Sequence, residues 1–143
     1  MPIVEKSVLI EHRAEQMFEL VDRVEDYPKY LPWCGGTELI ERTATRTAAT
    51  IHINFHGVRA SFSTINEKVI PVTMSIRLRE GPFRSMDGGW RFTPLGATAC
   101  KVEFRLHYEF SSKLLEKALG PVFARIVGTF VDSFVKRAGE IYG

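Results

Sequence analysis

Polar and apolar residues alternate along much of the first 110 positions, and this pattern predicts β-strands. A first run covers residues 4–10, and stronger runs follow at 51–56, 58–64, 74–79 and 100–110. A period of two places successive side chains on opposite faces of a sheet. In the run 100–110, Cys100 and Val102 begin one face and Lys101 and Glu103 the other. We therefore expect an antiparallel sheet that is dry on one face and wet on the other.

Glycine and proline separate these runs. Gly57, Pro71 and Gly81-Pro82 end strands, and Asp87-Gly88-Gly89 predicts a turn before a strand that starts at Trp90. A further strand is expected over residues 39–46. The total is six to seven antiparallel strands.

Helical periodicity occurs at two places. Apolar residues over 14–21 share one face of a short helix, and residues 24–36 predict irregular structure or short helical turns. Residues 112–142 predict a long helix whose apolar stripe is wide enough to lie in a groove of the sheet. Gly120-Pro121 predicts a break, with a short helix ending at Gly120 and the main helix starting at Pro121.

Composition limits the class of protein. A chain of 143 residues with 45% hydrophobic and 25% charged residues predicts a single globular domain over residues 1–143. The amino terminus lacks a signal-peptide pattern, and no uninterrupted apolar run approaches the ~20 residues of a membrane span. Two cysteines give no disulfide framework. We expect a cytoplasmic protein.

Charge is distributed unevenly along the chain. Residues 1–41 have a net charge of −5, and residues 42–105, with ten bases and four acids, have a net charge of +6. A basic sheet face would suit anionic lipid or RNA. Charged residues on a solvated sheet face are the alternative interpretation.

Candidate chemistry is sparse. His52 and His56 lie about 13 Å apart if both are on one strand, too far to share a metal ion. Cys34 is a loop thiol that we interpret as structural. Glu80 is the acid that the alternation places on the inner face of the sheet. The other polar atoms predicted on that face belong to Thr64, Asn66, Tyr108 and the Trp90 indole. The histidine spacing therefore predicts no metal site. We also predict no catalytic residue, because a positioned base is missing.

The inward side chains of the sheet and the long helix can line a ligand cavity or fill a solid core. Composition alone favours the solid core. The predicted lining residues are Phe55, Phe62, Met74, Ile76, Leu78, Trp90, Phe92, Phe104, Leu106, Tyr108, Phe123, Val127, Phe130 and Phe134.

Three separated motifs resemble the ubiquinone-binding START-like family. They are YPKYLPWC at residues 27–34, EGPFR at 80–84 leading to GWRF at 89–92, and FVKRA at 134–138 before the final Tyr-Gly. The family's bacterial branch includes proteins named ribosome-association toxins and is often labelled polyketide cyclase/dehydrase-like. The resemblance implies an α+β helix-grip (START/Bet v 1-like) fold, in which a curved antiparallel sheet wraps a long C-terminal helix around an apolar cavity. Tyr30, Leu31, Pro32 and Trp33 would then form the cavity mouth.

The resemblance also implies functions. The main expectation is a non-enzymatic protein that binds ubiquinone or a related isoprenoid quinone or lipid, supports respiratory quinone handling and contacts the inner membrane peripherally. The alternative is a toxin-like protein that binds the large ribosomal subunit through its Arg-rich sheet face and blocks subunit association. The third is a polyketide cyclase-like enzyme using an inward acid such as Glu80. DNA is not expected as a partner, and ubiquinone would be a bound ligand rather than a catalytic cofactor.

Overall fold

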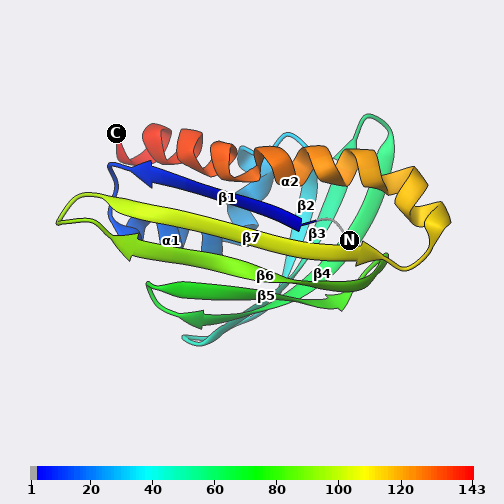
Figure 1. Cartoon of the computed structure of the whole chain (residues 1–143), viewed down its shortest axis with the longest axis horizontal. Coiled ribbons are helices and arrows are strands. Elements are labelled where there is room, and N and C mark those ends of the chain that lie inside the picture. Colours follow the sequence, from blue (N-terminus) through cyan, green and yellow to red (C-terminus); the bar gives the residue numbers. More distant parts are fainter. Residues whose placement is uncertain (1–2) are drawn as a thin grey trace.

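Seven antiparallel strands form one sheet in the computed structural model, which describes residues 3–143. The spatial order is β1-β7-β6-β5-β4-β3-β2, so the first and last strands of the chain are neighbours (Figure 1). The strands are β1 (Ile3–Ile10), β2 (Cys34–Arg42), β3 (Arg46–Phe55), β4 (Val58–Val69), β5 (Thr73–Glu80), β6 (Phe83–Pro94) and β7 (Cys100–Phe110).

Three helical segments complete the fold: α1 (Ala14–Asp22), the 3-10 helix η1 (Val24–Lys29) and α2 (Lys113–Tyr142). The start of α1 is capped, because the Gln16 side chain accepts a hydrogen bond from the backbone N–H of Arg13 at 2.9 Å. Ser112 caps α2 by accepting from the backbone N–H of Leu115 at 3.1 Å. Both helices therefore begin where side chains satisfy free backbone donors.

The curved sheet wraps around α2, which runs along its β1 edge (Figure 1). The helix buries Phe123, Ile126, Val127, Val131, Phe134 and Ala138. The Phe134 ring packs edge-on against the Trp90 ring of β6, with 5.5 Å between ring centroids. The predicted α+β architecture is confirmed, and the seven strands agree with the expected six to seven.

The predicted turn at Asp87-Gly88-Gly89 is wrong. These residues lie inside β6, where Gly88 pairs with Leu106 of β7 and Ile76 of β5. A β-carbon on Gly88 would lie 2.1 Å from the carbonyl oxygen of Arg105. The two glycines therefore serve the close approach of neighbouring strands.

The strand expected at residues 39–46 begins earlier. β2 starts at Cys34, and the chain turns after Arg42, where the backbone N–H of Thr43 donates to the carbonyl of Arg46 at 2.7 Å. The predicted helical turns after residue 24 correspond to η1, but residues 34–36 are already strand.

The predicted break at Gly120-Pro121 is also wrong, because α2 is one continuous helix through both residues. Figure 1 shows its first turns inclined to the rest of the helix, as proline inside a helix commonly causes. By length and composition α2 is apolar enough to cross a membrane. The search for uninterrupted apolar runs missed this property. In the structure 28% of that apolar window is buried.

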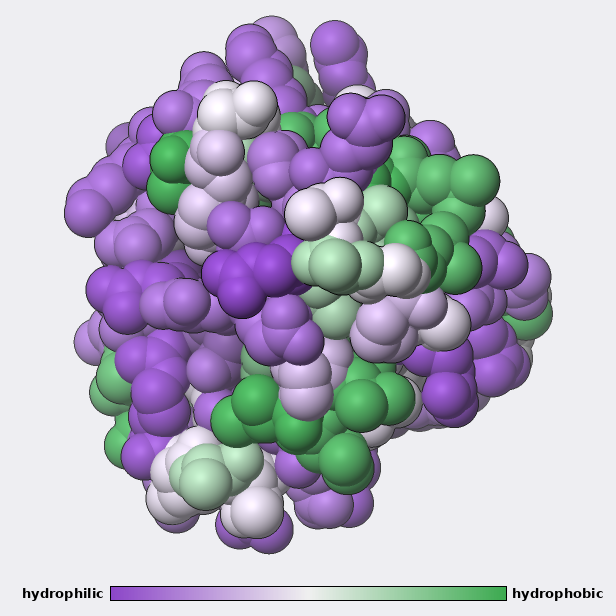
Figure 2. All heavy atoms as spheres, turned by 90° about the vertical axis from the view of Figure 1, so that its left-hand side faces the viewer, coloured by the Kyte–Doolittle hydropathy of each residue, from purple (hydrophilic) through white to green (hydrophobic). Residues whose placement is uncertain are grey.

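Turns between strands and the C-terminus form the end of the molecule opposite the start of α2 (Figure 1). Figure 2 views this end directly and shows apolar atoms gathered in separate areas among polar ones. The exposed large apolar residues on the elements that meet there are Leu9, Val69, Ile70, Val72, Leu95 and Ile141.

Candidate functional site

A cavity of about 60 Å³ lies between the inner face of the sheet and α2. Its wall is formed by strands β3 to β7, by the helices α1, η1 and α2, and by the segment that follows η1. The lining residues are Val21, Val24, Tyr27, Trp33, Ile51, Phe62, Thr64, Asn66, Ile76, Met86, Trp90, Phe104, Leu106, Phe123, Ile126, Val127 and Phe130.

Eight of the fourteen predicted lining residues surround this cavity. They are Phe62, Ile76, Trp90, Phe104, Leu106, Phe123, Val127 and Phe130. The other six, Phe55, Met74, Leu78, Phe92, Tyr108 and Phe134, lie elsewhere in or beside the core. Phe92 and Phe134, for example, are at most 1% exposed and are enclosed by other aromatic rings.

Sequence reasoning missed the contribution of α1 and η1. Val21, Val24 and Tyr27 line the cavity from the side opposite the sheet. The apolar face of α1 was visible in the sequence, but its partner surface was not, because the contact joins residues far apart in the chain. Ile51, Met86 and Ile126 were likewise absent from the predicted lining.

The segment predicted as the cavity mouth is mostly buried. Leu31 and Trp33 are 1% and 4% exposed, and only Trp33 lines the cavity. Pro32 is exposed, while Tyr30 is half-buried beneath the Arg137 guanidinium, 5.0 Å from its ring centroid. The segment therefore closes the cavity as a packed wall.

The cavity is almost entirely apolar and carries no charged lining residue among those that the structure describes. The Tyr27 phenol is turned away and donates to the carbonyl of Val21. Its complete burial raises the pKa of Tyr27 well above the ordinary value of 10.0. An environment that disfavours the phenolate also disfavours an anionic ligand.

An ion-pair network fixes α1 and η1 over the cavity. The Lys68 ammonium, 2% exposed, lies 3.0 Å from Asp22 Oδ2, and Thr47 donates to Asp22 Oδ1 at 2.7 Å. Arg42 contacts both carboxylate oxygens of Glu25, at 2.6 and 2.8 Å. Sequence reasoning did not find this network, because its members come from α1, η1 and three strands.

The Arg42 guanidinium holds the pKa of Glu25 below its ordinary value of 4.5. A lowered carboxyl pKa stabilises the folded state above that ordinary value. This contribution is lost as pH falls through the folded-state pKa, so the η1 contact weakens below about pH 4.5.

The residues considered for catalysis are not arranged for it. The prediction that Glu80 faces inward is wrong: its side chain is 71% exposed and pairs with Arg79 at 2.9 Å. Cys34 is buried at the start of β2, and burial raises the pKa of its thiol above the ordinary value of 9.0. His52 contacts Ser61 and Glu38 at 2.6 and 3.2 Å, and His56 lies in the turn after β3. Residues 3–143 contain no cluster of three metal-ligating side chains.

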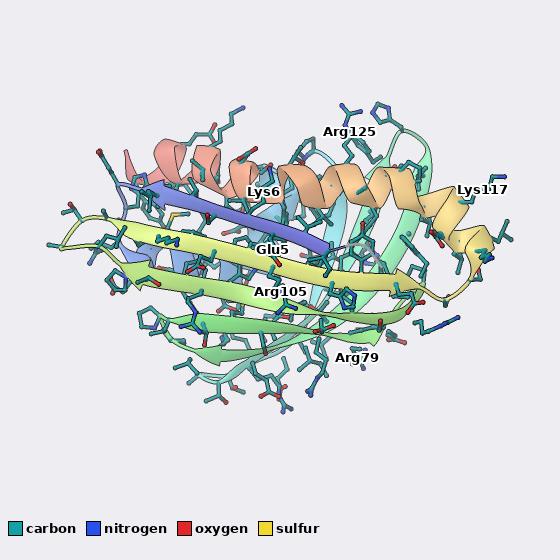
Figure 3. All side chains as sticks on the ribbon, in the orientation of Figure 1. Glu5, Lys6, Arg79, Arg105, Lys117 and Arg125 are labelled. Atoms are coloured by element: carbon teal, nitrogen blue, oxygen red, sulfur yellow. The ribbon has the colours of Figure 1, made fainter. Side chains whose placement is uncertain are left out.

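The outer sheet face has mixed charge. A shallow hollow of about 690 Å³ over Gly89 is bordered by both signs, including Glu5, Lys6 and Arg105, which Figure 3 labels on β1 and β7. Two arginines of the expected basic face are paired: Arg77 lies 3.2 Å from Glu67, and Arg79 contacts Glu80. Neighbouring carboxylates therefore offset part of the positive charge of this face.

Unpaired positive charge gathers at the end of the molecule where α2 begins and the β3–β4 turn lies beside it (Figure 1). We call this surface the basic end and define it by Arg59, Lys113, Lys117 and Arg125, exposed residues for which no ion pair forms within the described chain. The Arg125 guanidinium lies 5.7 Å from the Phe55 ring centroid and so links α2 to the β3–β4 hairpin. Figure 3 shows Lys117 and Arg125 projecting from α2.

The architecture is that of a helix-grip protein of the START/Bet v 1-like class, because a curved antiparallel sheet holds one long C-terminal helix. A family model described as polyketide cyclase/dehydrase and lipid transport matches residues 10–135. The chain belongs to this family.

Individual relatives differ in their named roles. The chain is 41% identical over 140 residues to a ribosome association toxin, RatA, of Vibrio cholerae, covering 98% of this chain and 97% of the relative. It is 28% identical over 145 residues to the mitochondrial coenzyme Q-binding protein COQ10 homolog B of Xenopus laevis, covering 96% of this chain and 58% of that protein.

Among solved structures, the ZhuI aromatase/cyclase from Streptomyces sp. R1128 has a similar fold. The TM-score is 0.84 at 16% identity, covering 99% of this chain and 96% of that one. At this identity the likeness concerns the fold alone.

Proposed function

We propose that this protein is a non-enzymatic factor that associates with the large ribosomal subunit by contacting ribosomal RNA. The observation that carries the proposal is its 41% identity, over nearly the whole of both chains, to a protein named for ribosome association. This was the alternative expectation from the sequence, and the comparisons support it better than the quinone-binding one.

The basic end is the surface that best suits RNA. Lys113, Lys117 and Arg125 lie on α2, and Arg59 lies on the β3–β4 hairpin, whose Phe55 contacts Arg125, so all four cations lie at the same end of the molecule. Unpaired cations can contact phosphates without first breaking an ion pair. The sheet face lacks this advantage, because Arg77 and Arg79 already contact carboxylates.

Charge reversal tests this assignment. The double variant Arg59→Glu/Lys117→Glu should weaken binding to purified large subunits at least about tenfold in co-sedimentation, because two phosphate contacts become repulsive. Two control variants change the net charge by the same amount. They are Arg77→Glu/Arg79→Glu on the sheet and Lys101→Glu/Lys136→Glu away from the basic end, and both should bind nearly as tightly as wild type. Equal loss in all three variants would show only a general charge effect and contradict a localised surface.

A second candidate function is the binding of a hydrophobic ligand between the sheet and α2. The uncharged, apolar cavity and the similarity to a protein named for coenzyme Q binding favour it. Ligand pockets usually measure about 300–1,000 Å³. At about 60 Å³ this cavity is much smaller, so binding requires its wall to move.

Phe130→Asp tests the second candidate. Phe130 lines the cavity and contacts the rings of Trp33 and Trp90, with centroid distances of 5.9 and 5.8 Å. Protein purified from a quinone-producing bacterium should carry a stoichiometric lipid or quinone in native mass spectrometry, and this variant should lose it while its circular dichroism spectrum is retained. If the wild-type protein carries no ligand and takes up no added ubiquinone, hydrophobic ligand binding is excluded as a function.

A further inference from the structure

Two polar atoms of the cavity wall lack hydrogen-bond partners. Trp33 Nε1, on a residue that is 4% exposed, and Asn66 Oδ1 are both buried and have no partner among the described residues. The Asn66 amide nitrogen is engaged with Met74 Sδ at 3.6 Å, which leaves its oxygen as the free group. Both residues line the same cavity.

Buried polar groups are nearly always satisfied, because an unmade hydrogen bond opposes folding. One free group here is a donor, the indole N–H, and the other is an acceptor, the amide oxygen. A carbonyl ligand would satisfy only the donor. A hydroxyl satisfies both, because its oxygen accepts from the indole and its hydrogen is donated to the amide.

We propose that the cavity is the polar subsite for a neutral, hydroxylated apolar molecule, with Trp33 Nε1 donating to the hydroxyl oxygen and Asn66 Oδ1 accepting its hydrogen. The proposal rests on the second candidate function above and adds the chemical class of the ligand. The uncharged lining restricts the ligand to neutral molecules, and the surrounding aromatic rings favour an apolar body.

The cavity also indicates where the body of the ligand lies. Its volume of about 60 Å³ accommodates a hydroxyl group and a few neighbouring atoms, not a whole lipid. Phe130 is half-buried and faces the rings of Tyr27 and Trp33, so its displacement would extend the cavity toward the surface between α2 and the segment after η1. Water is the competing occupant, because each molecule takes about 30 Å³ in the liquid.

Equilibrium dialysis with two matched ligand pairs tests the proposal. One pair is decylubiquinol and its dimethyl ether, kept under reducing conditions, and the other is farnesol and its methyl ether. Wild-type protein should bind the hydroxyl member of at least one pair about tenfold more tightly than the ether, and the preferred pair identifies an aromatic or an aliphatic alcohol as the source.

Three variants connect this preference to the two atoms. Trp33→Phe and Asn66→Leu keep an apolar wall, and each should reduce the hydroxyl preference about five- to tenfold. Tyr30→Phe is the control, because the Tyr30 hydroxyl is also buried without a partner but lies outside the cavity. This variant should retain the full preference.

The binding results distinguish a failure of the proposed polar subsite from a failure of hydrophobic ligand binding itself. Tight binding of alcohols and ethers alike would overturn the polar subsite and leave hydrophobic ligand binding intact. Failure of all four ligands to bind would overturn both, and water would then be the partner of Trp33 and Asn66.

Discussion

At the residue scale, Lys68 shows how burial changes the contribution of an ion pair to stability. It is an ordinary polar position of β4 in the sequence, yet the fold buries its ammonium beside Asp22. Lys29 makes an ion pair of the same 3.0 Å length with Asp26, but its side chain is 65% exposed. The two lysines therefore form a matched pair that differs mainly in burial.

Lys68→Met should destabilise the protein by about 3 kcal/mol, because the largely buried Asp22 carboxylate loses its nearest cation and keeps only Arg42, at 3.6 Å. Lys29→Met should cost less than about 1 kcal/mol, as is usual for exposed ion pairs. Urea unfolding of both variants measures the difference. Equal free energies of unfolding would mean that the Lys68 pair does not hold α1 in place.

At the element scale, alternation predicted most strands, since β7 keeps a two-residue period of burial throughout and β3, β4 and β5 keep it over part of their length. The errors fell on glycine and proline. Gly88-Gly89 resembles a hairpin turn locally, but the close approach of β5 and β7 keeps it within a strand. Pro121 is tolerated within α2 because the packing of the later turns holds the helix in its groove.

Gly88 and Gly128 give opposite predictions for the same substitution. Gly88→Ala should destabilise the protein by more than about 3 kcal/mol or prevent folding, since the added carbon would meet the Arg105 carbonyl oxygen at 2.1 Å. Gly128→Ala in α2 meets no atom of the described residues within 4 Å and should stabilise by up to about 1 kcal/mol. Thermal unfolding compares the two, and a tolerated Gly88→Ala would contradict the strand pairing of β6.

At the scale of the whole molecule, the sheet and α2 form three distinct regions: a small apolar cavity, a sheet face of mixed charge and a basic end. The sequence predicted the dry inner face and a net positive middle region. It did not predict that Arg77 pairs with Glu67, or that the β3–β4 hairpin lies beside Arg125 of α2, because both facts depend on strand register and helix packing.

The central claim is that the basic end contacts ribosomal RNA, and the salt dependence of binding to purified large subunits tests it most directly. Each phosphate contact adds roughly 0.7–0.9 to the slope of log affinity against log salt concentration. The account predicts that Arg59→Glu/Lys117→Glu lowers the magnitude of this slope by about 1.4–1.8 relative to wild type, while Lys101→Glu/Lys136→Glu leaves it unchanged. A wild-type slope near zero, or the same slope in wild type and the basic-end variant, would contradict the claim.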